Sequence, residues 1–155
     1  MNRTHGKLAF IWTAILFSAS SVVRADDVPV DKLPKAVVDS LKKQFPGCEI
    51  TKALSETEDN KLVYEVSLKH KGSNYDIIVT PEGKLNVVEK AIEVKDLPKP
   101  VMEALRKKYP SAKIDLAEEL SDGNGKITSY EVHLMAEGKK LAIEFSPDGK
   151  IVSEE

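Results

Sequence analysis

The chain has 155 residues, of which 41% are hydrophobic and 31% charged, and its formal net charge is −2. This mild acidity, with no basic face, argues against nucleic acid and against an anionic membrane surface as partners. Cys48 is the only cysteine, so the chain forms no internal disulfide and its stability has to come from a hydrophobic core. We expect Cys48 to be a small half-buried residue rather than a reactive thiol.

The first 25 residues have the pattern of a secretory signal peptide. Arg3 and Lys7 precede an apolar run over residues 8–17, and small residues then lead to a cleavage site after Ala25. A membrane anchor is the weaker alternative, because the run is shorter than the ~20 apolar residues that cross a bilayer. We therefore expect a periplasmic or secreted protein with no membrane insertion after cleavage. Its mature part keeps 20 basic residues against 25 acidic ones, a net charge of −5.

One module occurs twice in the mature part, over residues 26–92 and 93–155. The matching segments are Val30–Lys35 with Val94–Lys99, Tyr64–Val66 with Tyr130–Val132, and Thr80–Leu85 with Ser146–Ile151. The offset between the copies is 64 residues at first and 66 later. We expect the two-residue slip to lie in polar loops over residues 55–61 and 121–126.

Each copy is expected to open with an amphipathic helix. In the first copy Leu33, Val37, Leu41 and Phe45 recur every four residues and form one apolar stripe. Pro46 prevents the helix from continuing. The second copy repeats the stripe with Leu97, Val101, Leu105 and Tyr109.

Strands follow the helix in each copy. Alternating apolar residues predict strands over residues 62–69 and 75–79, with equivalents over 130–135 and 141–145. A weaker first strand is expected around 49–54 and 113–118. Gly83 and Gly149 mark hairpin turns, and the last strand covers residues 84–92 but is cut short at 151–155. The fold class is therefore α+β, with one N-terminal helix on an antiparallel sheet of about four strands in each module.

These motifs, in this order, resemble the PepSY-like, β-lactamase-inhibitor-like domains of exported bacterial proteins, present here in two tandem copies. The resemblance rests on the Leu-Pro start, the helix that ends in Phe-Pro or Tyr-Pro, the Tyr-Glu-Val strand and the Pro-Glu/Asp-Gly-Lys hairpin. It implies an exported protein whose modules lie side by side as one curved sheet. We expect a non-enzymatic module that binds a protein through its open sheet face, and inhibition of a secreted or periplasmic enzyme is what the resemblance alone implies.

The expected partner is another exported or envelope protein. Val63, Ile78, Ile127 and Met135 are apolar residues at positions expected to face water, and clusters of such residues mark interfaces. The outward strand positions also include Asp76. The residues proposed for partner binding are Val63, Glu65, Ser67, Lys69, Ile78, Glu131, His133, Met135 and Glu144.

The sequence contains no recognisable catalytic, cofactor-binding or metal-binding motif. We expect His70 and His133 to be surface residues, and Glu65 and Glu131 to be solvated on their strands. Asp122 and Asn124 could begin a calcium loop, but turn chemistry explains them better. Two alternatives stay open. One is a ligand or metal sensor with a polar pocket around Glu65, Lys69 and His133, and the other is a structural envelope protein.

Overall fold

The computed structural model describes residues 25–58 and 60–155. The predicted signal peptide, except for Ala25, lies outside the described residues. None of the helices in the described part is long and apolar enough to cross a membrane.

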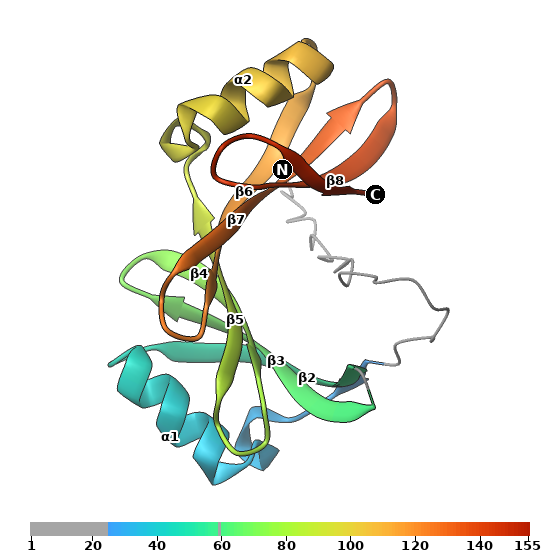
Figure 1. The fold of residues 1–155 in the computed structure, drawn as a ribbon. Coiled ribbons are helices and arrows are strands. Elements are labelled where there is room, and N and C mark those ends of the chain that lie inside the picture. The colour runs from blue at the N-terminus through green and yellow to red at the C-terminus, as the bar shows by residue number, and fades with distance from the viewer. Residues whose placement is uncertain (1–24, 59) are drawn as a thin grey trace, which may run out of the picture.

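In this described part, nine strands form a single antiparallel sheet in which each strand pairs with the next one along the chain (Figure 1). Each module contributes one short 3-10 turn, one α-helix and four strands. A two-residue strand is added at the N-terminal edge of the sheet. In chain order the elements are β1 (Asp26–Asp27), η1 (Val30–Lys32), α1 (Lys35–Gln44), β2 (Glu49–Glu58), β3 (Lys61–His70), β4 (Ser73–Val79), β5 (Leu85–Ile92), η2 (Val94–Asp96), α2 (Lys99–Lys108), β6 (Lys113–Asp122), β7 (Ile127–Ala136), β8 (Lys139–Phe145) and β9 (Ile151–Glu154).

The helices begin and end where the prolines predict. Pro34 and Pro98 occupy the N-cap positions, and the helices end one residue before Phe45 and Tyr109. A proline follows each of these aromatic residues, and the residue before a proline avoids helical angles. Lysines and an arginine fill the last turns, where cations complement the helix dipole.

Each helix packs on the strands of its own module and buries a separate core. The first core comprises Leu33, Val37, Leu41, Phe45, Ala53, Val66, Leu68, Ile77, Val79 and Val88. The second comprises Leu97, Val101, Leu105, Ala117, Tyr130, Val132, Leu134, Ala136, Ile143 and Phe145. Cys48 is half-buried against the first core, as expected.

His70 departs from the expectation of a surface residue. Its side chain is buried, and its ring stands edge-on to Phe45 with the centroids 5.7 Å apart. Tyr75 completes the aromatic group at 6.3 Å from His70. The last residue of β3 therefore turns toward the helix side of the sheet, and His70 serves in core packing.

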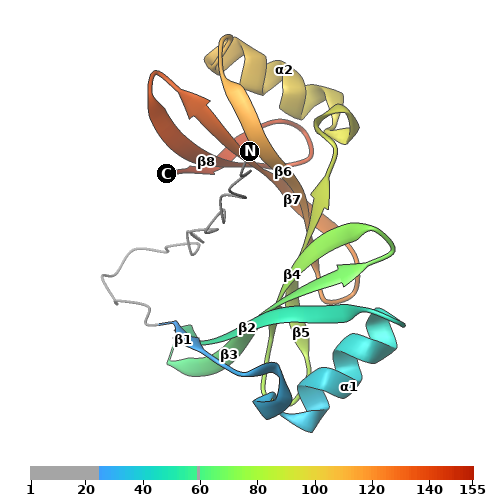
Figure 2. The same cartoon turned by 180° about the vertical axis from the view of Figure 1, so that it is seen from behind.

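The two modules are joined edge to edge. Strand β5 of the first module pairs with β6 of the second from Val87↔Asp122 to Ile92↔Ala117. This pairing places the modules side by side in one sheet, and it answers the question of sheet continuity, which the sequence left open. Both helices lie on the same, convex side of the sheet, as the two opposite views show (Figures 1 and 2). The other side, which carries no helix of the described chain, is called the open face below.

The two-residue slip between the copies lies in a hairpin turn, but the loops are shorter than expected. Strand β2 continues to Glu58 and β3 begins at Lys61, whereas β6 continues to Asp122 and β7 begins at Ile127. Two residues therefore connect the first pair of strands and four connect the second. In the longer turn Asp122 Oδ1 accepts the backbone N–H groups of Asn124 (2.9 Å) and Lys126 (3.0 Å). This turn chemistry agrees with the reading of Asp122 as a turn residue.

Candidate functional site

One acidic side chain from each of five consecutive strands reaches the middle of the open face. These residues, called the carboxylate floor below, are Glu65 (β3), Asp76 (β4), Glu89 (β5), Glu118 (β6) and Glu131 (β7). The strand register places Asp76 directly opposite Glu89, and Glu118 directly opposite Glu131. On β8, Glu144 stands opposite Glu131 and extends the row. Like charges directly opposite each other destabilise a sheet, so this arrangement requires neutralisation.

The carboxylate floor is largely buried, although no helix of the described chain covers it. Glu65, Glu89 and Glu118 are 5%, 4% and 6% exposed, and Asp76 and Glu131 are half-buried. The expectation of a solvated side chain is therefore wrong for Glu65, whereas Glu131 keeps partial exposure. In a curved sheet the side chains of neighbouring strands crowd together on the inner side, and apolar neighbours such as Leu120, 2% exposed and directly opposite Glu89, exclude water.

Glu89 stands out because it has no positive or hydrogen-bonding partner. Among the described residues no hydrogen bond or ion pair reaches its carboxylate, and its charged neighbours are Glu118, Glu131, Asp76 and Glu65. Burial, followed by repulsion from these four carboxylates, raises the pKa of Glu89 to about 10. In the absence of a bound cation this side chain is held as the neutral acid at pH 7.

The first-module part of the floor is also perturbed. Burial, together with repulsion from Glu56 and Asp76, raises the pKa of Glu65 to about 7. Burial likewise raises the pKa of Asp76, against the hydrogen bond that Ser67 Oγ donates to Asp76 Oδ1 over 2.5 Å. Lys52 lowers the pKa of both carboxyl groups, but only as a minor contribution.

Among the described residues, His133 is the basic side chain that forms ion pairs with the second-module carboxylates Glu118 and Glu131. Its Nε2 lies 2.6 Å from Glu131 Oε1 and 3.6 Å from Glu118 Oε2. These two contacts raise the pKa of His133 to about 9, although burial opposes the shift. Ligand atoms of Glu118, Glu131 and His133 all lie within 4.8 Å of one another, a spacing that a metal ion could bridge. His133 is therefore a member of the site and not an isolated surface histidine.

The apolar residues expected to form an interface are dispersed. Val63 is buried at 3% exposure, and Ile78 is half-buried beside Glu65. Ile127 and Met135 stand eight residues apart on β7, which corresponds to about 27 Å along an extended strand. They do not form one patch, so the main argument for an apolar docking surface is lost.

The remaining predicted positions fall on both sides of the floor. Ser67 is half-buried beside Asp76, Lys69 is exposed opposite Asn74, and Glu144 is buried at 9% exposure. The expected pocket around Glu65, Lys69 and His133 is not formed, because β3 and β7 are separated by β4, β5 and β6. The carboxylate floor occupies the space between these two strands instead.

Sequence reasoning missed Glu89 and Glu118, the two residues at the junction of the modules. In β5 the apolar Val88 and Ile92 face the cores, so the period-two alternation was available as a signal for an outward-facing Glu89. Glu118 was hidden by a register shift between Ile114 and Leu116, which moves the inward-facing positions of β6 by one residue. Ala117 thereby enters the core and Glu118 the open face.

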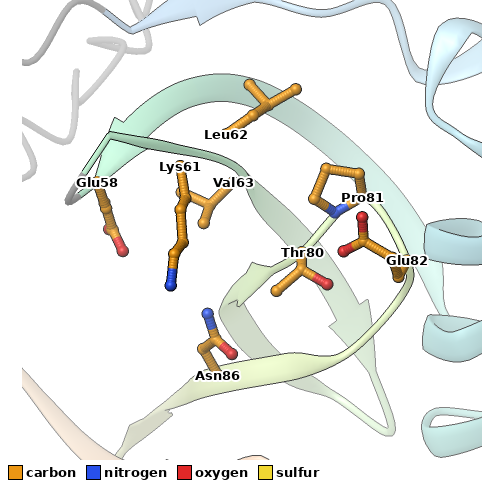
Figure 3. A pocket seen from close by; sticks show the side chains of 8 residues that line it. All are labelled: Glu58, Lys61, Leu62, Val63, Thr80, Pro81, Glu82 and Asn86. Atoms are coloured by element: carbon orange, nitrogen blue, oxygen red, sulfur yellow. The ribbon is translucent and has the colours of Figure 1, made fainter.

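A separate pocket lies between the tip of the β2–β3 hairpin and the β4–β5 turn. Lys61, Thr80, Glu82 and Asn86 are among the residues that line it, and Figure 3 shows the side chains of Lys61 and Asn86 approaching each other across it. Its polar residues are at most half-buried, and its charges are of both signs. This pocket has no convergent set of buried ionisable groups, so the carboxylate floor is the better candidate site.

Comparison with known proteins identifies the family. Residues 19–87 and 80–153 each match the family described as "Putative beta-lactamase-inhibitor-like, PepSY-like". The chain belongs to this PepSY-like family. The two matched regions confirm the two tandem copies that the sequence motifs predict. No curated protein matches the chain.

Solved structures share the fold of this PepSY-like chain. One is described as a "putative periplasmic" protein from Bacteroides eggerthii DSM 20697, with 17% identity and a TM-score of 0.64 over 79% of this chain and 87% of that one. Another is a BLIP-like protein from Bacteroides fragilis NCTC 9343, with 23% identity and a TM-score of 0.60 over 77% of this chain and 83% of that one. At these identities the comparison shows the fold alone.

Proposed function

We propose that this PepSY-like chain is an exported, non-enzymatic protein of the cell envelope that binds a divalent cation on the open face of its sheet. The observation that carries the proposal is the buried carboxylate floor with the unpartnered Glu89 at its centre. Periplasmic or secreted localisation is supported by the signal-like N-terminus and by the description of the structural neighbour from B. eggerthii.

A cation explains a placement that is otherwise unfavourable. Burying an ionised carboxylate without a partner costs several kcal/mol, on the order of the stabilisation that a whole domain retains. Glu89 meets Asp76 in register on one side and approaches Glu118 and Glu131 on the other. A small ion can reach such a group and take oxygen ligands from several strands at once, whereas a lysine side chain from a partner would need a wide opening. Carboxylates in this number are the ligands that divalent cations prefer.

Protons and cations would compete for the same oxygens. The raised pKa of Glu89 and Glu65 means that the carboxylate floor can also be neutralised by protons. Ligands must be deprotonated for a metal to bind, so cation affinity is expected to increase with pH. The chain would then respond to two signals of the envelope, the cation concentration and the pH.

Thermal unfolding of the metal-free mature protein, residues 26–155, tests this proposal. Calcium, magnesium, manganese and zinc chlorides are each added at millimolar excess at pH 8. We expect at least one of them to raise the melting temperature by several degrees, because a ligand at about 100 times its Kd stabilises the native state by about 2.7 kcal/mol. An exchange of both Glu118 and Glu131 for glutamine should remove the shift. No shift with any cation would overturn the proposal.

Binding of an envelope protein through the open face is a second candidate function. It is favoured by the β-lactamase-inhibitor-like description of the family and by the uncovered inner side of the curved sheet. Since the apolar residues are dispersed, the partner is expected to contribute basic side chains to the rim of the carboxylate floor. Affinity capture with the mature protein tests this, with a Glu65/Glu131 double variant as control bait. A partner retained equally by both baits would contradict it.

A further inference from the structure

The nitrogen of His133 distinguishes one end of the carboxylate floor from the rest. We propose that Glu118, Glu131 and His133 of the second module bind a transition-metal dication of the zinc class, beside the buried Glu89 of the first module. This inference rests on the proposed cation-binding function and names the ligand class and the position of the site.

The geometry of the three second-module residues fits such a metal. Zinc takes imidazole nitrogen and carboxylate oxygen at about 2.0–2.2 Å, so tetrahedral ligand atoms lie roughly 3.4 Å apart. The Nε2 atom of His133 lies 3.6 Å from Glu118 Oε2, close to this value. Its 2.6 Å contact with Glu131 Oε1 is a hydrogen bond that has to open by less than 1 Å for an ion to enter. The same ring nitrogen faces both carboxylates, so one imidazole lone pair can serve the ion.

Glu89 supplies an observation independent of the triad. It is 4% exposed, no described residue is a hydrogen-bonding or cationic partner to it, and its two strongest charge interactions are with Glu118 and Glu131. Its strand, β5, is the last of the first module and pairs with β6, the strand that carries Glu118. Glu89 is not one of the three residues whose ligand atoms lie within 4.8 Å of one another, so it stands beside the triad as a buried carboxyl group whose repulsion a bound metal would relieve.

The donor set selects the class of metal. Calcium and magnesium take oxygen ligands, whereas imidazole suits zinc, nickel, copper and iron. The first copy also has no histidine at the position equivalent to His133. The strand pairing equates Glu118, Glu131 and His133 with Leu54, Glu65 and Ser67. The duplicated fold thus carries the nitrogen-containing triad once, in the second module, and the first module provides a matched control.

Isothermal titration of the EDTA-treated mature protein with zinc chloride, and separately with calcium chloride, tests this site. A Cys48→Ser background removes the free thiol, which could bind zinc by itself. We expect one zinc ion per chain. His133→Gln and Glu131→Gln should each weaken zinc binding at least about tenfold, since ligand loss costs at least as much as loss of an outer-shell contact. His133→Gln should weaken zinc binding more than calcium binding, and Glu49→Gln, the control at an exposed glutamate of β2, should leave zinc binding unchanged.

The outcomes separate this inference from the proposed function. If calcium binds but His133→Gln leaves the zinc affinity unchanged in a folded variant, the transition-metal site is refuted and the cation-binding function stands. If neither metal binds, both are refuted. Circular dichroism of each variant before titration shows that the fold is retained. Glu118→Gln serves as the replacement test if His133→Gln does not fold, and an unchanged zinc affinity in that variant would also refute the site.

Discussion

Replacing Glu89 with glutamine is expected to raise the melting temperature of the metal-free protein at pH 8 and to abolish most of its stabilisation by divalent cations. Glutamine has the same size and shape as the glutamate but carries no charge. At pH 8 the wild-type Glu89 has to take up a proton on folding to escape repulsion from Asp76, Glu65, Glu118 and Glu131, and glutamine removes this cost because it is neutral in both states. We expect a gain of roughly 1–3 kcal/mol in the free energy of unfolding, the range in which burial of an unpaired polar or charged group operates.

Chemical denaturation of the wild type and of Glu89→Gln, with and without cation, measures both effects. Glu49→Gln is the matched control, because Glu49 is an exposed glutamate on β2 of the same sheet. Its stability should change by less than about 0.5 kcal/mol, as for most surface substitutions. A destabilised Glu89→Gln, or one that keeps the full response to cation, would show that Glu89 has a structural partner and no role in the site.

The metal-free protein is expected to lose stability steadily as the pH rises from 5 to 9. The folded-state pKa of Glu65 is raised to about 7 and that of Glu89 to about 10, against 4.5 in the unfolded chain, and that of His133 to about 9 against 6.5. All three shifts are upward. The folded protein therefore holds more protons than the unfolded one across this range, and its stability falls with pH.

Each group acts in its own window. The contribution of Glu65 is fully present below pH 4.5 and is lost as the pH rises toward 7, that of Glu89 is lost between 4.5 and 10, and that of His133 between 6.5 and 9. Each excess proton corresponds to a slope of about 1.4 kcal/mol per pH unit. Surface carboxyls whose pKa is lowered, such as Asp148 at about 2, act in the opposite direction, but only at lower pH.

Denaturant midpoints measured at unit intervals from pH 5 to 9 after EDTA treatment check this expectation. The control is Glu89→Gln, in which the fall between pH 5 and 9 should be shallower by up to one proton's slope. A saturating divalent cation should flatten the wild-type profile at its alkaline end. A midpoint that stays constant or increases toward pH 9 in the metal-free wild type would contradict the perturbed state of the carboxylate floor.

The sequence was sufficient for the fold because the core positions repeat with local periods. Val37 and Leu41 in the helix, and Val66 and Ile77 in the strands, are all buried without detectable exposure, as their spacing predicts. Their second-module equivalents repeat the pattern. The edge-to-edge junction of the modules could not be predicted from these local periods. The pairing of β5 with β6 depends on a register between distant parts of the chain.

The site escaped sequence reasoning for the same reason. Glu65, Glu131 and His133 were correctly placed on the outward face, but an alternating pattern does not say how strongly that face curves. The crowding of five strands buries these residues, and the register shift in β6 brings Glu118 opposite Glu131. The pattern of each single strand predicts that its acidic residue is solvated. The buried cluster arises only when the strands assemble into the sheet.

Divergence between the copies has a physical meaning in this arrangement. The core residues are duplicated, whereas Ser67 and His133 occupy equivalent positions on β3 and β7 with different chemistry. Ser67 donates a hydrogen bond to Asp76, and His133 contacts Glu118 and Glu131. One fold repeated twice therefore presents an asymmetric open face, with a nitrogen donor at one end only.

The most direct test of cation binding on the open face is anomalous X-ray diffraction from crystals of the mature protein grown with manganese or zinc. The account predicts a strong anomalous peak within about 2.0–2.6 Å of carboxylate oxygens of Glu118 and Glu131. A well-ordered crystal without such a peak, or with peaks only at exposed surface carboxylates such as Asp148, would contradict it.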